Sequence, residues 1–170
     1  MFTLWGTYLV GIFLENARTA RVEDSKELEK LASIANEEMV QKRGGSTFDL
    51  LNPYYGDLSL MFSEAFESAD SEVVVGTIDE VIVGFGIAEI YELQDGTPHA
   101  SIRSLYVEEE ARSVGVGEVM MDALLGWAVE RKAAAIDAVA LPGDRQTKNF
   151  YETHGLVARA ITVQRNLHQP

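Results

Sequence analysis

Residues 102–132 restrict the fold more than any other part of the sequence, because they join a strand pattern, a glycine turn and a long helix pattern. Residues 102–107 form the strand pattern and lead through an acidic turn to residues 112–117, Arg-Ser-Val-Gly-Val-Gly. Beyond the glycines, apolar residues recur at the i, i+3 and i+4 spacing of an amphipathic helix: Val116, Val119, Met120, Ala123, Leu124, Trp127 and Ala128. The pattern predicts a helix that begins at the Gly-x-Gly and packs one face on a core.

The predicted start of this helix is a suitable place for a phosphate. The first turn of a helix leaves backbone N–H groups unpaired and carries a partial positive charge, and glycine allows a ligand to approach the backbone closely. A dinucleotide-binding fingerprint would need a third glycine where Met120 stands, and a Walker loop would need Gly-Lys-Ser or Gly-Lys-Thr. The sequence therefore indicates a phosphate cradle of another type.

The remainder of the chain predicts one α/β domain. With 170 residues, 46% hydrophobic and 24% charged, the chain suits a single globular core. Strand patterns occur at residues 19–22, 72–78, 81–91, 136–141 and 157–164, and Asp24, Asp57 and Asp144 are predicted to cap helices, Asp24 in a capping box with Glu27. Hairpins are antiparallel, and a strand–helix–strand crossover is parallel and right-handed. We therefore expect one mixed β-sheet flanked by helices on both faces.

The first residues are apolar and do not fit this pattern. They are too short to span a bilayer and lack the basic region of a signal peptide, so neither a membrane partner nor secretion is expected. Alternating apolar positions predict that residues 3–14 add a strand to the same sheet or to a partner. We therefore divide the chain into an apolar extension, residues 1–16, and one domain, residues 17–170. The apolar extension also makes a homodimer a reasonable expectation.

Charge and cysteine content narrow the class of function. The formal net charge is −13, which argues against nucleic acid as a partner because such proteins neutralise phosphates with basic patches. An acidic chain attracts cationic molecules such as amines. The absence of cysteine excludes disulfides, thiolate metal sites and a cysteine nucleophile, and it is compatible with a reducing cytoplasm, where we expect the protein.

Three motifs in fixed order resemble the GNAT acyltransferase superfamily over residues 18–165. They are Leu-Tyr-Val at residues 105–107, the Arg-x-x-Gly-x-Gly of residues 112–117, and Asn-Phe-Tyr-Glu-Thr-His-Gly-Leu at residues 149–156. The resemblance implies a single-domain acyl-CoA N-acyltransferase fold of the α/β class. It also implies acetyl-CoA as the co-substrate, no metal, and direct attack of an amine without a covalent enzyme intermediate.

The resemblance also assigns roles to individual residues. The backbone of residues 105–107 would bind the pantetheine as though it were an added strand, and a backbone N–H near Tyr106 or Val107 would polarise the acyl carbonyl. Tyr151 would donate a proton to the departing thiolate. The residues expected to bind acetyl-CoA are Leu105, Tyr106, Val107, Arg112, Ser113, Val114, Gly115, Val116, Gly117, Glu118, Asn149 and Phe150.

Several positions depart from the pattern of the superfamily. Glu118 stands where a small hydroxyl or basic residue is usual, and Ser101 stands where many members carry a glutamate that acts as general base. The candidates left for the base are Glu89, His99, His154 or a water relay. Glu89 is our choice because it is expected on the same strand face as the apolar residues Val83, Phe85 and Ile87, which would raise its pKa by burial.

Other residues have a purely structural interpretation. His99 follows a proline turn and is expected at the surface. The Arg112 side chain could pair with Glu108, Glu109 or Glu110 in the acidic turn instead of meeting a ligand. Tyr151 could be a core aromatic at a helix end.

Three functions are compatible with these observations. The leading hypothesis is an N-acetyltransferase that transfers an acetyl group from acetyl-CoA to a primary amine of a small molecule or a protein in a ternary complex. The alternative is a non-catalytic acyl-CoA-binding regulatory module, which Ser101 supports. A third hypothesis, acetylation of aminoacyl-tRNA, is opposed by the acidic charge. The acceptor pocket is expected among the helices of residues 24–69 and the loop of residues 43–56.

Overall fold

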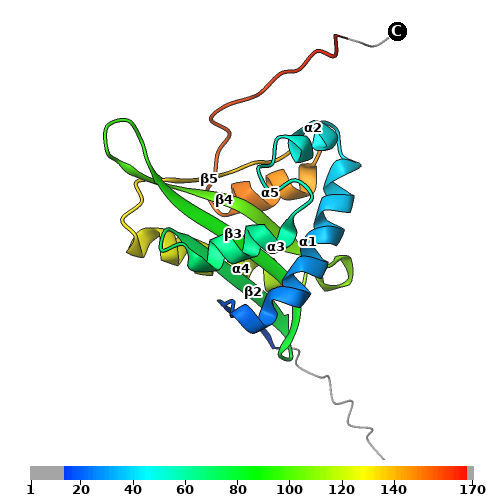
Figure 1. Ribbon diagram of the computed structural model, residues 1–170, viewed down its shortest axis with the longest axis vertical. Helices are drawn as coiled ribbons and strands as arrows, with labels where there is room; N and C mark the ends of the chain where they lie inside the picture. The colour runs from blue at the N-terminus through cyan, green and yellow to red at the C-terminus, as the bar shows by residue number, and fades with distance from the viewer. Residues whose placement is uncertain (1–13, 168–170) are drawn as a thin grey trace, which may run out of the picture.

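The computed structural model describes residues 14–167, which form one five-stranded sheet and the helices around it (Figure 1). The strands are β1 (Glu15–Thr19), β2 (Ser71–Ile78), β3 (Val81–Glu92), β4 (Pro98–Val107) and β5 (Ile136–Ala138). The helices are α1 (Ser25–Val40), α2 (Gly45–Leu50), α3 (Leu58–Glu67), α4 (Val116–Glu130) and α5 (Arg145–Thr153), with 3-10 turns at Val22–Asp24 and Glu109–Ala111. None of these helices is long and apolar enough to cross a membrane.

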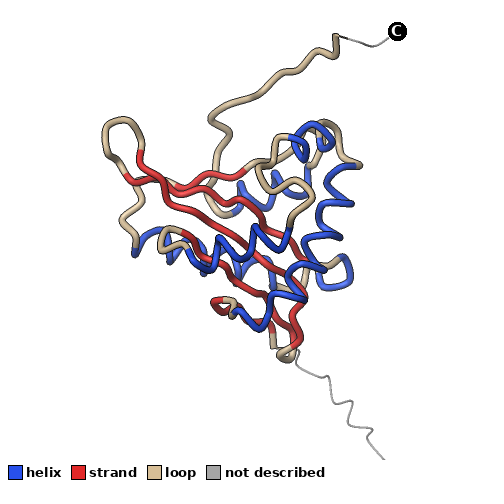
Figure 2. Tube along the Cα trace, viewed as in Figure 1, coloured by secondary structure: helices blue, strands red, loops and turns tan. Residues whose placement is uncertain are grey.

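The sheet is mixed, as the sequence predicts. Its strand order is β1-β2-β3-β4-β5, with antiparallel pairing throughout except between β4 and β5, which are parallel. Figure 2 shows the strands in red and the helices that surround them in blue. Apolar side chains of α1 and α3 pack on one face of the sheet, and those of α4 and α5 pack on the other. The α/β fold with helices on both faces is therefore confirmed.

Each face has its own apolar core. On the α1/α3 face, Leu28 and Leu31 of α1 meet Phe62 of α3 and Phe85 of β3, and the two phenylalanine rings contact edge to face at 5.7 Å. On the opposite face, the predicted stripe of α4 packs against the sheet with Val116, Met120, Met121 and Leu124 fully buried. The helical periodicity of the sequence thus corresponds to real buried faces.

Helix α4 lies close to the sheet at Gly76 of β2. A Cβ atom at this position would lie 2.5 Å from Cγ1 of Val116 and 2.7 Å from Sδ of Met120. Val116 is the first residue of α4, so the contact fixes the height of the glycine turn above the sheet. The space that a side chain would need at Gly76 is already occupied by the helix.

Replacing Gly76 with alanine is therefore expected to lower the free energy of unfolding by about 1–3 kcal/mol, because the helix must move outward or Val116 must leave its preferred rotamer. Urea denaturation measures the change. Gly126→Ala is the control, since Gly126 lies inside α4 with nothing within 4 Å of its Cβ position, and it should stabilise the protein by about 1 kcal/mol. Two variants of equal stability would contradict the packing described.

A bulge at Arg103 separates the last residues of β4 from β5. Ile87 pairs with Ser104 and Ala88 pairs with Ile102, so Arg103 is an extra residue opposite β3. Such a bulge bends a strand and increases its twist. Strand β5 pairs only with Ala100–Ile102, and residues 103–107 continue past the bulge with no described strand on that side. The two parallel strands therefore splay apart at their carboxyl ends.

Two predictions for the start of the domain were wrong. The first strand is Glu15–Thr19 rather than residues 19–22, and a 3-10 turn occupies Val22–Asp24. Asp24 does not cap α1 through a capping box, because its carboxylate accepts hydrogen bonds from Arg18 at 2.7 Å and from the N–H of Arg21 at 2.8 Å. A basic partner on β1 takes the carboxylate away from the helix.

Other boundaries also differ from the sequence patterns. The region of residues 43–56, expected to be a loop, contains helix α2, and β5 ends at Ala138 rather than at residue 141. No strand occurs at residues 157–164, which run as an extended segment that pairs with no described strand. Side chains of the segment contact other elements: Nε of Arg159 donates to Asp137 at 3.1 Å, and Nε2 of Gln164 donates to Oγ1 of Thr47 at 3.3 Å. The strand expected at residues 3–14 lies outside the described residues, apart from Leu14.

Candidate functional site

The open side of β4 presents backbone groups to the gap between β4 and β5. The N–H of Glu108 donates to the carbonyl of Val83 at 2.9 Å, so alternate residues of β4, Tyr106 and Ser104, face β3. Leu105 and Val107 then face the gap. The Val107 carbonyl accepts a hydrogen bond from Nε of Arg112 at 2.8 Å. Of the two N–H groups considered from the sequence, that of Val107 therefore points to the gap and that of Tyr106 points to β3.

The glycine turn places a row of backbone N–H groups beside the same end of β4. Ser113 and Gly115 both have positive φ, +67° and +99°, and α4 begins at Val116. None of the N–H groups of residues 113–118 donates a hydrogen bond within the described part of the chain. Unpaired N–H groups at a helix start, next to left-handed residues, form a concave site for an anion.

Gly117 is also a contact point between α4 and α5. A Cβ atom there would lie 3.3 Å from the ring of Phe150. Phe150 thus packs the start of α4 against α5, and its neighbour Asn149 is exposed. Glu118 is exposed as well, so its side chain is not buried in the turn.

Tyr151 lies buried on the α4/α5 face of the sheet. Its side chain is 9% exposed and belongs to the same apolar cluster as Ile102 and Leu105 of β4. Burial, assisted by the charge of Asp144, raises the pKa of Tyr151 to about 12. Asp144 caps α5 as predicted, accepting from the N–H of Thr147 at 3.1 Å. The phenol therefore keeps its proton at neutral pH, beside the open part of β4.

A charged network that the sequence does not reveal holds α1 to the end of β4. Glu38 of α1 accepts a hydrogen bond from the hydroxyl of Tyr106 at 2.7 Å and from Nη2 of Arg112 at 2.7 Å. Burial raises the pKa of Glu38, but the two donors outweigh burial and leave it below its usual value. The suggested pairing of Arg112 with the acidic turn was wrong: its guanidinium joins Glu38 to the Val107 carbonyl.

Glu38→Gln is expected to lower the free energy of unfolding by about 1 kcal/mol at neutral pH, because it weakens two charge-assisted hydrogen bonds. The folded-state pKa of Glu38 is depressed, so its contribution is present above the unfolded pKa of about 4.3 and is lost as pH falls through the folded value. Urea denaturation at neutral pH and at a pH below the folded-state pKa of Glu38 measures this difference. Glu37→Gln, an exposed neighbour, is the control and should change little. Equal stability of wild type and Glu38→Gln at neutral pH would contradict the network.

Glu89 lies on the α1/α3 side of the sheet and is not isolated. Its carboxylate is 3.0 Å from Nη1 of Arg103, and the Arg103 guanidinium lies over the ring of Tyr54 at 5.6 Å. Glu89 borders a hollow of about 340 Å³ that also includes Tyr54 and Glu64, whose side chains are hydrogen-bonded at 2.7 Å. Val83 does not share this face, because it packs on the α4 side.

The two histidines considered as bases have structural partners. His99 is buried rather than exposed, so the expectation for it was wrong; its Nε2 is 3.0 Å from Oδ2 of Asp137 and its ring contacts Tyr91. His154 has Nδ1 2.8 Å from the carbonyl of Phe150. Neither imidazole is free to meet a substrate in this arrangement.

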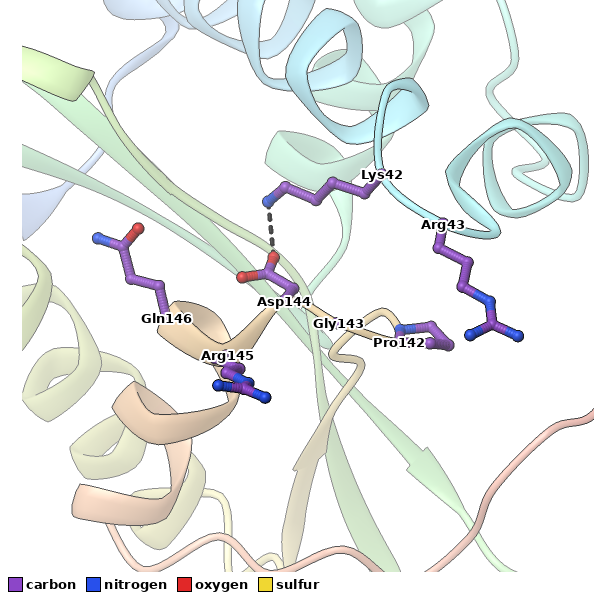
Figure 3. A pocket seen from close by; sticks show the side chains of 7 residues that line it. All are labelled: Lys42, Arg43, Pro142, Gly143, Asp144, Arg145 and Gln146. Atoms are coloured by element: carbon purple, nitrogen blue, oxygen red, sulfur yellow. Dashed lines mark hydrogen bonds and ion pairs between the residues drawn. The ribbon is translucent and has the colours of Figure 1, made fainter.

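A cavity of about 570 Å³ lies between the end of α1 and the start of α5 (Figure 3). Lys42 reaches across the cavity to Asp144, with Nζ 2.6 Å from Oδ2. Burial raises the pKa of Asp144, but hydrogen bonds from Lys42 and Thr147 lower it by more, so the pKa lies below its usual value. The residues that line the cavity are Lys42, Arg43, Pro142, Gly143, Asp144, Arg145 and Gln146. Three cations against one carboxylate make the lining of this cavity locally positive.

The sequence profile of the acetyltransferase (GNAT) family matches residues 29–156, well over half of the chain. The chain belongs to the GNAT acetyltransferase family. The matched region includes β4, the glycine turn, α4 and α5, which together build the site described above. No curated protein matched the chain significantly.

Solved structures share the fold of this GNAT protein. A Bacillus halodurans protein, solved as a tetramutant, is 22% identical, covers 89% of this chain and 99% of its own, and has a TM-score of 0.74. A predicted acetyltransferase from Clostridium acetobutylicum, crystallised with acetyl-CoA, is 17% identical, with 91% and 97% coverage and a TM-score of 0.69. A ribosomal-protein-alanine N-acetyltransferase from Brucella melitensis biovar Abortus is 16% identical, with 90% and 99% coverage and a TM-score of 0.66.

The structure brings most of the candidate residues of this GNAT protein to one end of the sheet. The residues around the gap are Leu105, Val107, the N–H groups of residues 113–118, Phe150 and Tyr151. Tyr106 and Arg112 lie next to the gap, and both donate hydrogen bonds to Glu38. The sequence analysis missed Glu38, because a contact between residues 68 apart leaves no local pattern. Glu89 is on the opposite face, paired with Arg103.

Proposed function

We propose that this protein is an acetyl-CoA-dependent N-acetyltransferase that acts on a primary amine of a small molecule or a protein. The observation that carries the proposal is the gap between β4 and β5, where the open backbone edge of Leu105 and Val107 lies next to the unpaired N–H groups of residues 113–118. An extended pantetheine arm with a pyrophosphate at one end has the matching chemistry. The similar Clostridium acetobutylicum structure was solved with acetyl-CoA, which supports this choice of co-substrate.

In the proposed complex, each part of the co-substrate has a defined partner. The pyrophosphate accepts hydrogen bonds from the first turn of α4, where the helix dipole is also favourable. The pantetheine amides pair with the open edge of β4 in the manner of an added strand. Lys42, Arg43 and Arg145 line the neighbouring cavity and offer positive charge to a phosphate-bearing ligand.

The proposed reaction is a single acyl transfer within a ternary complex. The neutral amine nitrogen attacks the thioester carbonyl carbon, a C–N bond forms and the C–S bond breaks. The N–H of Val107 donates to the carbonyl oxygen as negative charge develops. Tyr151 gives its proton to the departing sulfur, and the proton lost by the amine leaves through water. The tyrosine then regains a proton from solvent.

The negative charge on the α1/α3 face of the sheet supports an amine acceptor. Glu64 and Glu89 lie on the α1/α3 side of the sheet, where they border the same hollow. Carboxylates on the acceptor side attract a protonated amine and bring it to the site before it loses its proton. The cytoplasmic location expected from the cysteine-free sequence stays a prediction.

The test is an amine panel incubated with the protein and acetyl-CoA, in which release of free CoA thiol is followed and the acetylated product is identified by mass spectrometry. We expect thiol release that depends on the amine and scales with protein concentration. A matched set of alcohols without amino groups is the control. Binding of acetyl-CoA without turnover of any amine would contradict the proposed activity.

The second candidate is a non-catalytic acyl-CoA-binding regulatory module. Two observations favour it: Ser101 has no carboxylate, and the carboxylate of Glu89 is paired with Arg103. Neither position therefore supplies a free carboxylate for the general base. Under this alternative, acetyl-CoA still binds at the glycine turn, and Tyr151→Phe has no consequence for any measured property except stability.

A further inference from the structure

The cavity between the end of α1 and the start of α5 is lined by two arginines that form no ion pair within the described part of the chain. They are Arg43 and Arg145, and both are exposed. The third cation of the lining, Lys42, is already paired with Asp144 (Figure 3). A guanidinium presents a planar fork of donors that matches a carboxylate or a phosphate. The cavity therefore offers two unpaired cations to an anionic group.

The same cavity lies next to the proposed site of acyl transfer. On the α1 side, Lys42 follows Glu38 by four residues at the end of the helix, and Glu38 accepts a hydrogen bond from Tyr106 of β4 at 2.7 Å. On the α5 side, burial and then the charge of Asp144 raise the pKa of Tyr151, which places Asp144 near the phenol. A molecule in the cavity is therefore close to both the end of β4 and Tyr151.

Acetyl-CoA leaves the two arginines without a defined partner. In the proposed complex its pyrophosphate binds N–H groups of residues 113–118, and its pantetheine pairs with the open edge of β4. The charge of Arg43 and Arg145 then attracts acetyl-CoA only at long range, and physiological salt screens such attraction beyond about 8 Å. The cavity is thus available to the second substrate.

The charge of the whole chain restricts which anion the second substrate carries. The formal net charge is −13, so a negatively charged acceptor is repelled by the protein as a whole. An ammonium with one carboxylate is neutral overall, and its ammonium group is attracted by Glu64 and Glu89 on the α1/α3 side of the sheet. A phosphate monoester carries about −1.5 to −2 and would leave the acceptor negative. A carboxylate is therefore the anion that fits.

We propose that the acceptor is a small amine that carries a carboxylate, and that Arg43 and Arg145 bind this carboxylate while the amine reaches the thioester. The inference rests on the proposed acetyl transfer and narrows its substrate class. The bonds that change are those already described: the C–N bond forms, the C–S bond breaks, and Tyr151 protonates the departing sulfur. The carboxylate of the acceptor stays ionised and orients the amine.

The first test compares amino acids with their own carboxamides. The amino acids differ in the distance between amine and carboxylate, and release of CoA thiol gives kcat/KM for each compound. At least one amino acid should exceed its carboxamide about 10-fold. A carboxylate favours the protonated form of a nearby amine, so this preference cannot arise from a larger share of neutral amine. If carboxamides react as fast as the acids, this inference fails and acetyl transfer stands; if no amine reacts, both fail.

The second test reverses the charge of each arginine. Arg43→Glu and Arg145→Glu should each raise KM for the preferred amino acid about 10-fold and change KM for its carboxamide less than about twofold. Lys26→Glu is the matched control, because Lys26 is exposed at the opposite end of α1 and undergoes the same change in charge. It should behave as the wild type. Arginine variants with an unchanged KM for the amino acid would overturn the proposal.

Binding of the co-substrate distinguishes the carboxylate of the acceptor from the 3′-phosphate of acetyl-CoA. Isothermal titration calorimetry at about 0.15 M salt should give Kd values for acetyl-CoA that agree within about twofold between Arg43→Glu and the wild type. Acetyl-3′-dephospho-CoA is the control ligand. If Arg43→Glu weakens acetyl-CoA about 10-fold but leaves the dephospho compound unchanged, the cavity binds the 3′-phosphate, which would overturn the proposal.

Discussion

Tyr151→Phe should lower kcat for acetyl transfer about 100-fold and leave KM for acetyl-CoA within about twofold. The hydroxyl is the only group removed, and the ring keeps its place in the cluster with Ile102 and Leu105. Because the proton is needed only as the C–S bond breaks, its loss affects the chemical step and not binding of the thioester. Steady-state kinetics with the amine found in the panel measure both constants.

The pH dependence gives an independent check on the same residue. Burial raises the pKa of Tyr151 to about 12, so the phenol remains protonated and wild-type kcat should not fall between about pH 7 and pH 10 through loss of this proton. Tyr55→Phe is the control, since Tyr55 is 59% exposed and should be replaceable without effect on kcat. If Tyr151→Phe retains the wild-type kcat, the phenol is a packing residue and the leaving thiolate is protonated by another donor.

Gly117→Glu is expected to weaken binding of acetyl-CoA at least about 100-fold, a loss of about 3 kcal/mol. The new side chain starts 3.3 Å from the ring of Phe150 and brings a carboxylate to the first turn of α4, where the pyrophosphate would bind. Both the displacement of α5 and the repulsion between anions act in the same direction. Isothermal titration calorimetry measures the affinity.

The same helix provides the matched control. Gly126→Glu makes the identical change in charge and size farther along α4, where nothing lies within 4 Å of the Cβ position, and its affinity for acetyl-CoA should equal that of the wild type. Circular dichroism should show that both variants are folded. Equal affinities of Gly117→Glu and the wild type would mean that acetyl-CoA binds elsewhere.

Local patterns predicted the central part of the fold. The spacing of apolar residues and the position of the glycines determine α4 and its start at Val116, and the carboxylate of Asp144 caps α5 as expected. The hairpin between β2 and β3 was found from its two-residue connection, where Asp79 and Glu80 both adopt positive φ. In each case the determining residues are neighbours in the sequence.

Features that depend on distant partners were not predictable in this way. Asp24 was expected to cap α1, but Arg18 on β1 takes its carboxylate. The pairing of Glu38 with Tyr106 and Arg112 and the bulge at Arg103 depend on how α1 and β3 lie against β4. A strand at residues 157–164 was predicted from composition, but a strand also requires an adjacent edge.

In the candidate site, too, the features set by local motifs were predicted, and those that depend on distant partners were not. The glycine turn and the motif around Tyr151 were identified from the sequence, and the structure places both beside the open end of β4. The direction of the β4 backbone could not be deduced, because it depends on the bulge, which leaves Leu105 and Val107 rather than Tyr106 facing the gap. The roles of Tyr151, Glu89 and the residues assigned to acetyl-CoA stay predictions.

The structure of the complex with acetyl-CoA tests the central claim most directly. We predict that the pyrophosphate accepts hydrogen bonds from N–H groups of residues 113–118 and that the pantetheine lies in the gap along Leu105 and Val107. The thioester carbonyl should meet the N–H of Val107, with its sulfur beside the hydroxyl of Tyr151. A crystal structure with acetyl-CoA bound outside the gap between β4 and β5, or with the gap closed by protein, would contradict the account.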